Sequence, residues 1–423
     1  MALTRKAVLY LGLAYLFIGL ALIFREPSLT IFVIPLAFFL FHSSLFAPPP
    51  ELNLKIRRSL NPPRSFGGES IHVTLQIRND SELEVSELHL EDVLPESLKL
   101  ESGTNSLILS LAPREQVEHF YRISAPKRGR YLIGPFTVRS TDIMGFRQRV
   151  ETIPSRDQVM ILPRVQDIGT VELRARRVGP WPGAVPSRTL GAGTEFFELR
   201  PYISGDELRR INWKASAKLA RWIANEFETE RVTDVMVVTD CSESALSRLF
   251  AFDVEEFQVN LAASLCSQLL QQGNRVGLLV YGAERTWVAP AFGKRQLLRT
   301  LSGLAIVKAG QALVPIDYAV EAIVAAVLPA RSVIVFISPF MGPDIVELVG
   351  DVAAAGYSVL CLTPTAESVV KDETQDRMLA RKILATERRI NMRRVLAVSR
   401  LIEVSPHTPI RLLLRRRIPW KTV

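Results

Sequence analysis

Residues 191–244, GAGTEFFELRPYISGDELRRINWKASAKLARWIANEFETERVTDVMVVTDCSES, decide the fold of this chain. They join a run of paired charges and aromatic residues to the apolar run at 235–239. A short, continuously apolar and β-branched run is typical of a strand that is buried on both faces of a parallel sheet. This strand delivers Asp240 into an Asp-x-Ser-x-Ser arrangement with Ser242 and Ser244.

The part of the segment before this strand predicts a small unit of its own. Residues 195–200 are expected to be extended, and the alternation at 221–228 predicts a second strand. Between them, a turn precedes a helical pattern at 207–218, and Asp206 is placed to cap that helix.

Downstream of Asp240, helical and strand patterns alternate to the end of the chain. Strands are expected at 275–281, 332–338, 357–363 and 401–404, with 286–288 extending a hairpin. Helices are expected at 252–272, 297–307, 318–327, 344–355 and 372–398. This alternation predicts an α/β domain with a mostly parallel central sheet that helices cover on both faces.

The amino-terminal part predicts a transmembrane hairpin. Residues 8–24 and 29–47 carry no acidic or basic side chain, and each run approaches the ~20 residues that cross a bilayer. Only four residues separate the two runs. A cleaved signal peptide is the alternative for the first run, but no small-residue cleavage site follows it.

The distribution of basic residues predicts the orientation of this hairpin. Arg5 and Lys6 precede the first span, and Lys55, Arg57 and Arg58 follow the second. Because Lys and Arg favour the cytoplasmic side, we expect a cell-membrane protein with two spans and with its soluble domains in the cytoplasm.

The chain between the hairpin and the α/β domain predicts an Ig-like β-sandwich. Short alternating runs separated by turn signals recur between residues 51 and 165. The alternative is an envelope protein with an extracytoplasmic sandwich, in which the Asn79-Asp80-Ser81 sequon would be reachable. The expected organisation is a hairpin at 1–50, a sandwich at 51–165, a linker at 166–190, a signature block with the α/β domain at 191–405, and a basic tail at 406–423.

Composition and charge exclude several classes of function. Cys241, Cys266 and Cys361 lack the spacing of a disulfide framework or a zinc site. The net charge of +9 arises in residues 371–423, which hold fourteen Lys and Arg against five Asp and Glu. Such a segment suits anionic lipid, nucleic acid or an acidic partner, or is simply a solvated helix face. No specific nucleic acid is expected, because Trp420 alone supplies aromatic interleaving.

The segment GDELRRINWKASAKLARWIANEFETE, followed by VMVVTDCSES, resembles the signature of the domain of unknown function 58 (DUF-58) family. In that family a "GD..R.I.W..SA" block precedes a von Willebrand factor A-like, Rossmann-like domain. The run KRGRYLIGPFTVRSTDIMGF at 127–146 is similar to a second block of the family, with Ile143-Met144 in place of Pro-Phe. The residues that match the first block are Tyr202, Gly205, Asp206, Arg209, Arg210, Ile211, Trp213, Lys214, Ser216, Ala217, Glu228 and Glu230.

The resemblance implies a role in assembly rather than a reaction. Members of the family are associated with MoxR-type AAA+ ATPases, so the expected function is a non-enzymatic, membrane-anchored adaptor that acts on an unknown client protein. The matching residues are then candidates for partner contact, although seven acidic and seven basic residues between 195 and 231 also suit an internal salt-bridge lattice. Ile211 and Trp213 are expected in the core. Arg209, Arg210 and Lys214 are expected at the surface.

The resemblance also implies a degenerate metal-ion-dependent adhesion-type site. Asp240, Ser242 and Ser244 offer oxygen ligands of the kind that Mg²⁺ prefers. The loop at 310–318 lacks the expected Thr, and the strand at 332–338 runs into Pro339-Phe340 where an Asp is expected. Two alternatives remain open, a metal-dependent hydrolase that uses Asp240 and serines that only cap the next element. No catalytic residue is predicted, and no G-x-x-x-x-G-K-[ST] loop is present.

Overall fold

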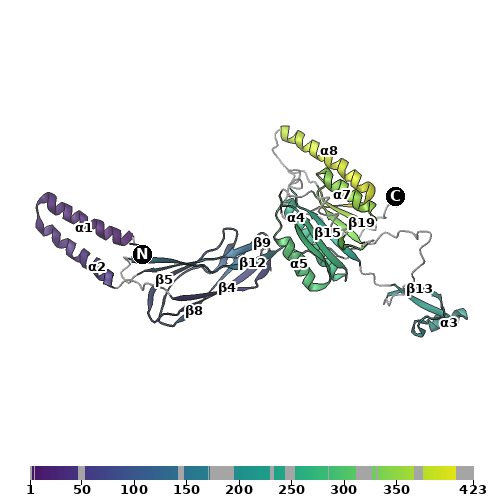
Figure 1. Cartoon of the computed structure of the whole chain (residues 1–423), viewed down its shortest axis with the longest axis horizontal. Coiled ribbons are helices and arrows are strands. Elements are labelled where there is room, and N and C mark those ends of the chain that lie inside the picture. The colour runs from purple at the N-terminus through teal and green to yellow at the C-terminus, as the bar shows by residue number, and fades with distance from the viewer. Residues whose placement is uncertain are drawn as a thin grey trace. The chain divides into compact units, whose positions relative to one another are not determined.

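The protein is described from a computed structural model, in which the chain divides into two compact units (Figure 1). One unit is Met1–Arg164 with Leu304–Ile306, and the other is Val165–Gly303 with Val307–Val423. The structure describes residues 2–3, 5–45, 53–141, 147–169, 171, 195–228, 233–242, 253–283, 285–310, 326–329, 332–365 and 375–405. The expected tail at 406–423 and most of the expected linker lie outside these residues.

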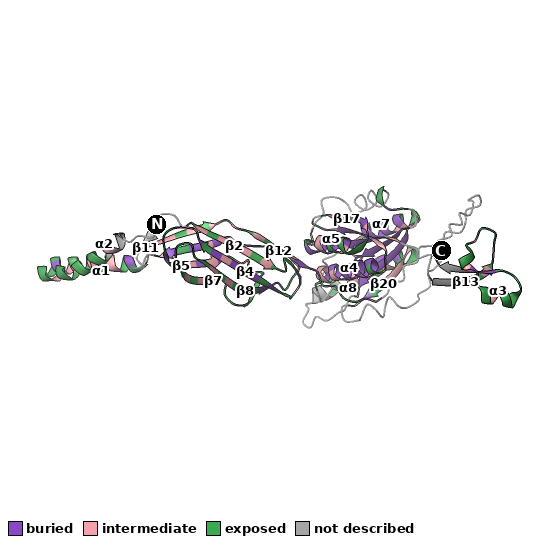
Figure 2. Ribbon diagram, turned by 90° about the horizontal axis from the view of Figure 1, so that it is seen from below, coloured by how far each residue is buried: buried purple, intermediate pink, exposed green. Residues whose placement is uncertain are grey.

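The first unit begins with apolar helices. Its first elements are β1 (Ala2–Leu3), α1 (Arg5–Phe24), the 3-10 helix η1 (Pro27–Phe32) and α2 (Val33–Leu45). Among the described residues, α1 is the one helix long and apolar enough to cross a membrane, and Figure 2 shows it largely exposed. The second predicted span begins as η1 and continues for 13 α-helical residues. Two complete spans therefore remain a prediction.

Two main sheets follow, with the orders β2-β4-β8-β6 and β1-β11-β10-β5-β7, beside a small sheet β3-β12-β9. Inward residues of β4 alternate with outward ones, as expected for a strand with one buried face. One core cluster joins β4 and β8 of the first sheet to β5 and β10 of the second. The strands are β2 (Leu54–Asn61), β3 (Arg64–Phe66), β4 (Ser70–Asn79), β5 (Val85–Asp92), β6 (Lys99–Ser102), β7 (Ser106–Leu111), β8 (Gln116–Ser124), β9 (Gly129–Ile133), β10 (Phe136–Thr141), β11 (Arg147–Ile153) and β12 (Asp157–Leu162).

A buried arginine links these sheets. Arg58 on β2 donates to both oxygens of Asp92 at 2.9 and 2.6 Å and to Asp157 at 2.6 Å. The side chains of Arg58 and Asp92 are fully buried, and the Tyr121 hydroxyl donates to the same Asp92 at 2.6 Å. The guanidinium also lies over the ring of Phe136, with 4.3 Å to the centroid. Because an unpaired buried charge is costly, loss of Arg58 would leave Asp92 unpaired and destabilise this unit.

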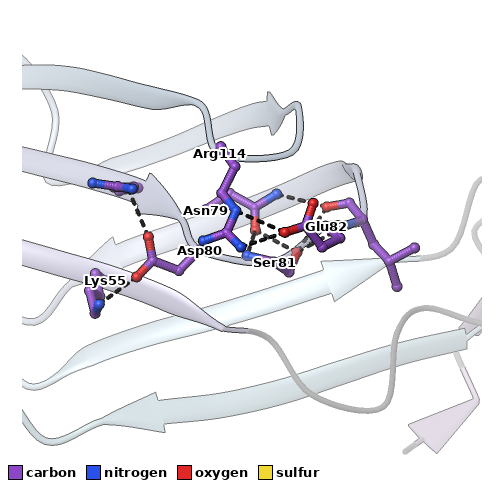
Figure 3. A network of polar contacts seen from close by, with 8 residues as sticks. Lys55, Asn79, Asp80, Ser81, Glu82 and Arg114 are labelled. Atoms are coloured by element: carbon purple, nitrogen blue, oxygen red, sulfur yellow. Dashed lines mark hydrogen bonds and ion pairs between the residues drawn. The ribbon is translucent and has the colours of Figure 1, made fainter.

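The side chain of Asn79, the acceptor residue of the sequon, is buried within a network of hydrogen bonds (Figure 3). Asn79 is fully buried, and its amide nitrogen donates to the carbonyl oxygens of Leu83, Leu111 and Ala112. Its side-chain oxygen accepts from Ser81. The prediction that this sequon would be reachable is wrong for the folded chain, because the nitrogen to be modified is engaged three times. Figure 3 also shows the surrounding ion pairs, Lys55–Asp80 and Arg114–Glu82.

Residues 195–228 form a small module in the second unit. Its elements are β13 (Glu195–Pro201), η2 (Leu208–Arg210), α3 (Trp213–Leu219) and β14 (Ile223–Glu228), and the two strands pair antiparallel. Both predicted strands are confirmed. The predicted single helix at 207–218 is wrong, because Ile211 and Asn212 are extended and separate η2 from α3. Asn212 caps α3 through its side chain, and Asp206 does not.

The rest of the second unit is an α/β layer structure around a six-stranded sheet of order β17-β16-β15-β18-β19-β20. All neighbours pair parallel except β16 and β17, which confirms the mostly parallel sheet. The elements are β15 (Asp234–Asp240), α4 (Val254–Gln271), β16 (Arg275–Tyr281), β17 (Thr286–Ala291), α5 (Gly293–Ala305), β18 (Val333–Ile337), α7 (Pro343–Ala354), β19 (Ser358–Pro364), α8 (Gln375–Val398) and β20 (Arg400–Val404).

The connections reverse direction at the centre of this sheet. From β15 the chain passes through α4 to β16 on one side, and from β18 it passes through α7 to β19 on the other. Right-handed crossovers then place α4 and α7 on opposite faces, as Figure 1 shows. Open α/β sheets bind ligands where the strand order reverses, at the carboxyl ends of the strands. That position is the end of β15 and β18. Most of the helix expected at 318–327 lies outside the described residues.

Candidate functional site

Asp240 ends the central strand β15 at this reversal point. Every residue from Val235 to Asp240 is buried, because neighbouring strands and helices cover both sides of the strand. Asp240 itself is 4% exposed. A carboxylate in such a position must find hydrogen-bond donors within the protein.

Three donors meet the two oxygens of Asp240. The backbone nitrogen and the hydroxyl of Ser242 donate to Oδ1 at 3.1 and 2.6 Å. The hydroxyl of Ser338 donates to Oδ2 at 2.8 Å. Sequence reasoning placed Asp240 and Ser242 together but missed Ser338. The position of Ser338 in the sequence could have identified it. It directly follows β18 and directly precedes the Pro339-Phe340 pair, where an Asp was expected.

The loop after β18 connects this carboxylate to α8. The backbone nitrogen of Phe340 donates to the Ser338 hydroxyl at 3.0 Å, and Phe340 is fully buried with a left-handed φ of 53°. From α8, Asn391 donates to the Phe340 carbonyl at 3.1 Å, and Arg388 donates to the Pro339 carbonyl at 3.0 Å. A continuous chain of hydrogen bonds therefore runs from Asp240 to the buried face of α8.

Neighbouring backbone segments approach Asp240 closely. A Cβ at Gly282 would lie 3.0 Å from the Cys241 carbonyl oxygen and 3.1 Å from that of Lys308. The nitrogen of Gly310 donates to the Cys241 carbonyl at 3.2 Å, and Gly310 forms a bridge with Ser242. The edge of the sheet is thus closely packed around the residue that follows Asp240.

Burial raises the pKa of Asp240 above its ordinary value, although the hydrogen bonds from Ser242 and Ser338 oppose this shift. A divalent cation needs several oxygen ligands with available lone pairs and usually more than one carboxylate. The described residues offer one carboxylate that already accepts three hydrogen bonds, and no group of three His, Cys, Asp or Glu lies together among them. They do not by themselves fit Mg²⁺. Ser244 and the loop at 311–318 lie outside the described residues, so the metal site stays a prediction.

The module at 195–228 holds most of the other predicted residues. Arg200 binds Asp206 through two hydrogen bonds of 2.7 and 2.8 Å, and the backbone nitrogen of Ile203 donates to the same carboxylate. The Arg200 hydrogen bond and then the Ile203 nitrogen lower the pKa of Asp206 to about 2. Gly205 has a φ of 108°, which favours glycine, and it forms the turn that directs Asp206 back to Arg200.

Ser216 fixes α3 to the hairpin. Its hydroxyl donates to the Asn212 carbonyl at 2.8 Å and accepts from the Ile223 nitrogen at 2.9 Å. Arg209 and Arg210 both pair with Glu207, so part of the predicted salt-bridge lattice is present. Glu228 ends β14, and Glu230 lies outside the described residues.

An exposed aromatic cluster distinguishes this module. Trp213 and Trp222 are 65% and 57% exposed, and their ring centroids lie 6.4 Å apart. Tyr202 packs edge-on against Trp222 at 5.4 Å. The prediction that Trp213 is a core residue is wrong, because its side chain is exposed at the start of α3, whereas Ile211 is buried as expected. Lys214, which follows Trp213 on α3, is exposed.

Residues 198–369 match the family described as Protein of unknown function DUF58. The chain is similar to the uncharacterized protein YeaD of Bacillus subtilis (strain 168), with 22% identity over 271 residues, which cover 63% of this chain and 66% of YeaD. It is also similar to the uncharacterized protein Rv1480 of Mycobacterium tuberculosis (strain ATCC 25618 / H37Rv), with 31% identity over 159 residues. These residues make up 36% of this chain and 49% of Rv1480. The chain thus spans under two thirds of the first relative and about half of the second.

Two solved structures show low similarity to part of this chain. A fragment of Escherichia coli alpha-2-macroglobulin matches with a TM-score of 0.23 and 18% identity, over 27% of this chain and 17% of that chain. The CARDB domain of the PF1109 protein from Pyrococcus furiosus matches with a TM-score of 0.20 and 14% identity, over 27% of this chain and 97% of that chain.

Proposed function

We propose that the chain is a membrane-anchored, non-enzymatic adaptor, because its residues 198–369 match the DUF58 family. Its von Willebrand factor A-like domain and the preceding module would dock a MoxR-type AAA+ ATPase during assembly or maturation of a client complex. The apolar helix α1 supports the anchor. The two-span topology with cytoplasmic domains is part of the same proposal.

The observation that carries the proposal is the exposed tryptophan pair of the module. Tryptophan, tyrosine and arginine are the residues that most often dominate binding energy at protein interfaces. Trp213, Trp222 and Tyr202 form a contiguous aromatic group, and exposed apolar groups of this kind mark interaction sites. Lys214, Lys218 and Arg221 are exposed beside it and form no ion pair with a described carboxylate, so an acidic partner surface is favoured.

A pull-down with matched variants tests this proposal. The full chain is held in lipid nanodiscs, and capture of the MoxR-type ATPase is compared between the wild type and Trp213→Ala/Trp222→Ala. We expect at least a tenfold loss of capture in the variant, since two anchor residues each contribute roughly 1–2 kcal/mol or more. Phe120→Ala is the control, because Phe120 is a 60% exposed aromatic residue on β8. Equal capture by all three proteins would refute the tryptophan pair as the docking surface, and no capture by any of them would refute this partner.

The topology is tested separately by protease accessibility. Intact cells and inverted vesicles are treated with protease, and cleavage within the exposed turns of the sandwich is followed. We expect cleavage only in inverted vesicles. Cleavage in intact cells would favour the alternative of an extracytoplasmic sandwich.

A further inference from the structure

Helix α8 carries an apolar stripe on the face that it turns away from the sheet. Leu379, Ile383 and Ile390 are 62%, 52% and 48% exposed. Together with Thr386 and Ala397 they recur at intervals of three, four and seven residues, which places them along one side of a helix. We call these five residues the outer stripe of α8.

The opposite face of α8 holds the helix in place. Val395 is fully buried, and Arg388 and Asn391 bind the backbone of the loop after β18. Arg388 also donates to Thr363 Oγ1 at 3.0 Å at the end of β19. Because these contacts fix the rotation of α8, the outer stripe has no freedom to turn inward.

Basic residues flank the outer stripe, and most of them lie along one border. Lys382, Arg389 and Arg393 lie along one border, and Arg394 lies on the other. All four are exposed, and none forms an ion pair with a carboxylate in the described part of the chain. Glu387 is exposed on the Arg394 border and offsets the charge there, so the net positive charge lies along the border of Lys382, Arg389 and Arg393. An apolar stripe beside a row of basic residues is the pattern of helices that lie in the headgroup region of anionic bilayers.

We infer that the outer stripe of α8 and its basic borders bind the surface of an anionic phospholipid bilayer. The charge complementarity favours an anionic surface, and the apolar stripe favours one with an accessible hydrocarbon boundary. The same chain carries α1, so a bilayer is present wherever the protein is anchored. The inference does not depend on the ATPase partner, because the tryptophan pair and α8 are separate elements.

A fluorescent label on the outer stripe measures this contact directly. The full chain is reconstituted in phosphatidylcholine nanodiscs, and an environment-sensitive dye is attached at Thr386→Cys. The native thiols are buried, and burial raises the pKa of Cys266 and of Cys361 to about 12, so the labelling is selective. A chain without the added cysteine, treated with the same dye, is the blank. Vesicles of phosphatidylcholine alone, or of phosphatidylcholine with phosphatidylglycerol, are then added.

We expect a blue shift of the dye only with phosphatidylglycerol vesicles. Reversing three border charges, in Lys382→Glu/Arg389→Glu/Arg393→Glu, should weaken binding about a hundredfold, since each cation near an anionic surface contributes about fivefold. The matched control is Lys294→Glu/Arg295→Glu/Arg299→Glu on α5, which makes the same change in net charge at three exposed positions. Ile383→Ser/Ile390→Ser should retain weak binding and lose the blue shift.

Several results would overturn the inference. These are an equal response to both kinds of vesicle, no response to phosphatidylglycerol, or an equal loss in the α5 control. A blue shift with soluble polyglutamate as large as that with phosphatidylglycerol would identify the face as a site for an acidic protein instead. Circular dichroism of each variant confirms that the fold is retained. The comparison of the two kinds of vesicle with the labelled Thr386→Cys chain needs no charge-reversal variant, so it decides the inference where such a variant does not fold.

Discussion

Ser338 donates a hydrogen bond of 2.8 Å to Asp240, across 98 positions of the sequence. The bond joins the last residue of β15 to the residue that follows β18. The strand order of the six-stranded sheet reverses between these two strands. The bond also begins the chain of hydrogen bonds that leads through Phe340 to Asn391 on α8. The strength of this one contact should therefore affect both the sheet and the helix that packs beside it.

Ser338→Ala should lower the free energy of unfolding by about 1–3 kcal/mol, because it leaves a buried carboxylate oxygen without its donor. Chemical denaturation of the full chain, with hydrogen exchange to localise the change, measures the loss. Ser332→Ala is the control, since Ser332 lies just before the same strand and donates only to the Pro329 carbonyl. Equal losses in the two variants would show that the Asp240 contact has no special weight.

Asp240→Asn should change how stability depends on pH. Burial raises the pKa of Asp240 above its ordinary value of 3.8, so the folded chain holds this proton more tightly than the unfolded chain. The contribution of the carboxyl to stability is fully present below about pH 4 and is lost as the pH rises through the folded-state pKa. The free energy of unfolding of the variant should increase relative to that of the wild type as the pH rises through that range. If the free energies of unfolding of the wild type and the variant differed by the same amount at every pH, the raised pKa of Asp240 would be contradicted.

Asp206→Asn should show the opposite pH dependence within the module at 195–228. Its pKa is lowered to about 2, so its stabilising effect is present above the ordinary value of 3.8 and is lost as the pH falls through about 2. Near-ultraviolet circular dichroism of the Tyr202–Trp222 contact should report weaker packing in the variant at neutral pH. The difference from the wild type should disappear in strong acid, and a difference that persists there would point to a cause other than the charge.

Arg58→Met should destabilise the β-sheet unit of residues 53–164 by about 3–5 kcal/mol, because it leaves the buried Asp92 without its cation. Arg57→Met is a matched control on the same strand, where the side chain is exposed and the expected change is small. Hydrogen exchange in β2, β4 and β8 measures both. Similar exchange in the two variants would mean that the buried pair adds nothing to the stability of this unit.

Titration calorimetry with Mg²⁺ tests the predicted metal site and the hydrolase alternative together. We expect no binding heat at millimolar Mg²⁺, since the described residues provide one carboxylate whose oxygens accept three hydrogen bonds. Asp240→Ala should give the same trace. Heat in the wild type that is absent from this variant would place a cation at Asp240 and favour the hydrolase.

Local patterns were sufficient to predict most elements of the α/β domain. The apolar run at 235–239 lies within the buried strand β15, and the runs at 332–338 and 357–363 contain β18 and most of β19. The hairpin of β16 and β17 and the helix α8 were also expected. Such elements are predictable because the period of apolar residues along a few turns or one strand determines which face is buried.

The failures concern features that the local apolar pattern does not record. The helical pattern after Asp206 was correct in part, but the pairing of Arg200 with Asp206 decided where the turn ends. Trp213 was expected in a core, and the described residues that pack around α3 leave it exposed. Asn79 was expected to be a reachable sequon, but its amide nitrogen donates to the carbonyl oxygens of Leu111 and Ala112, more than thirty positions away.

By itself, the sequence determined the membrane-compatible helix, the strand that carries Asp240 and the order of the α/β elements, because these follow from short-range periodicity and chain length. Tertiary structure alone decided that Ser338, and not a carboxylate, faces Asp240. It also decided that Arg388 and Asn391 turn α8 so that its apolar stripe points outward. Partners far apart in the chain are chosen by packing and by the need to satisfy buried polar groups, and neither is readable from one segment alone.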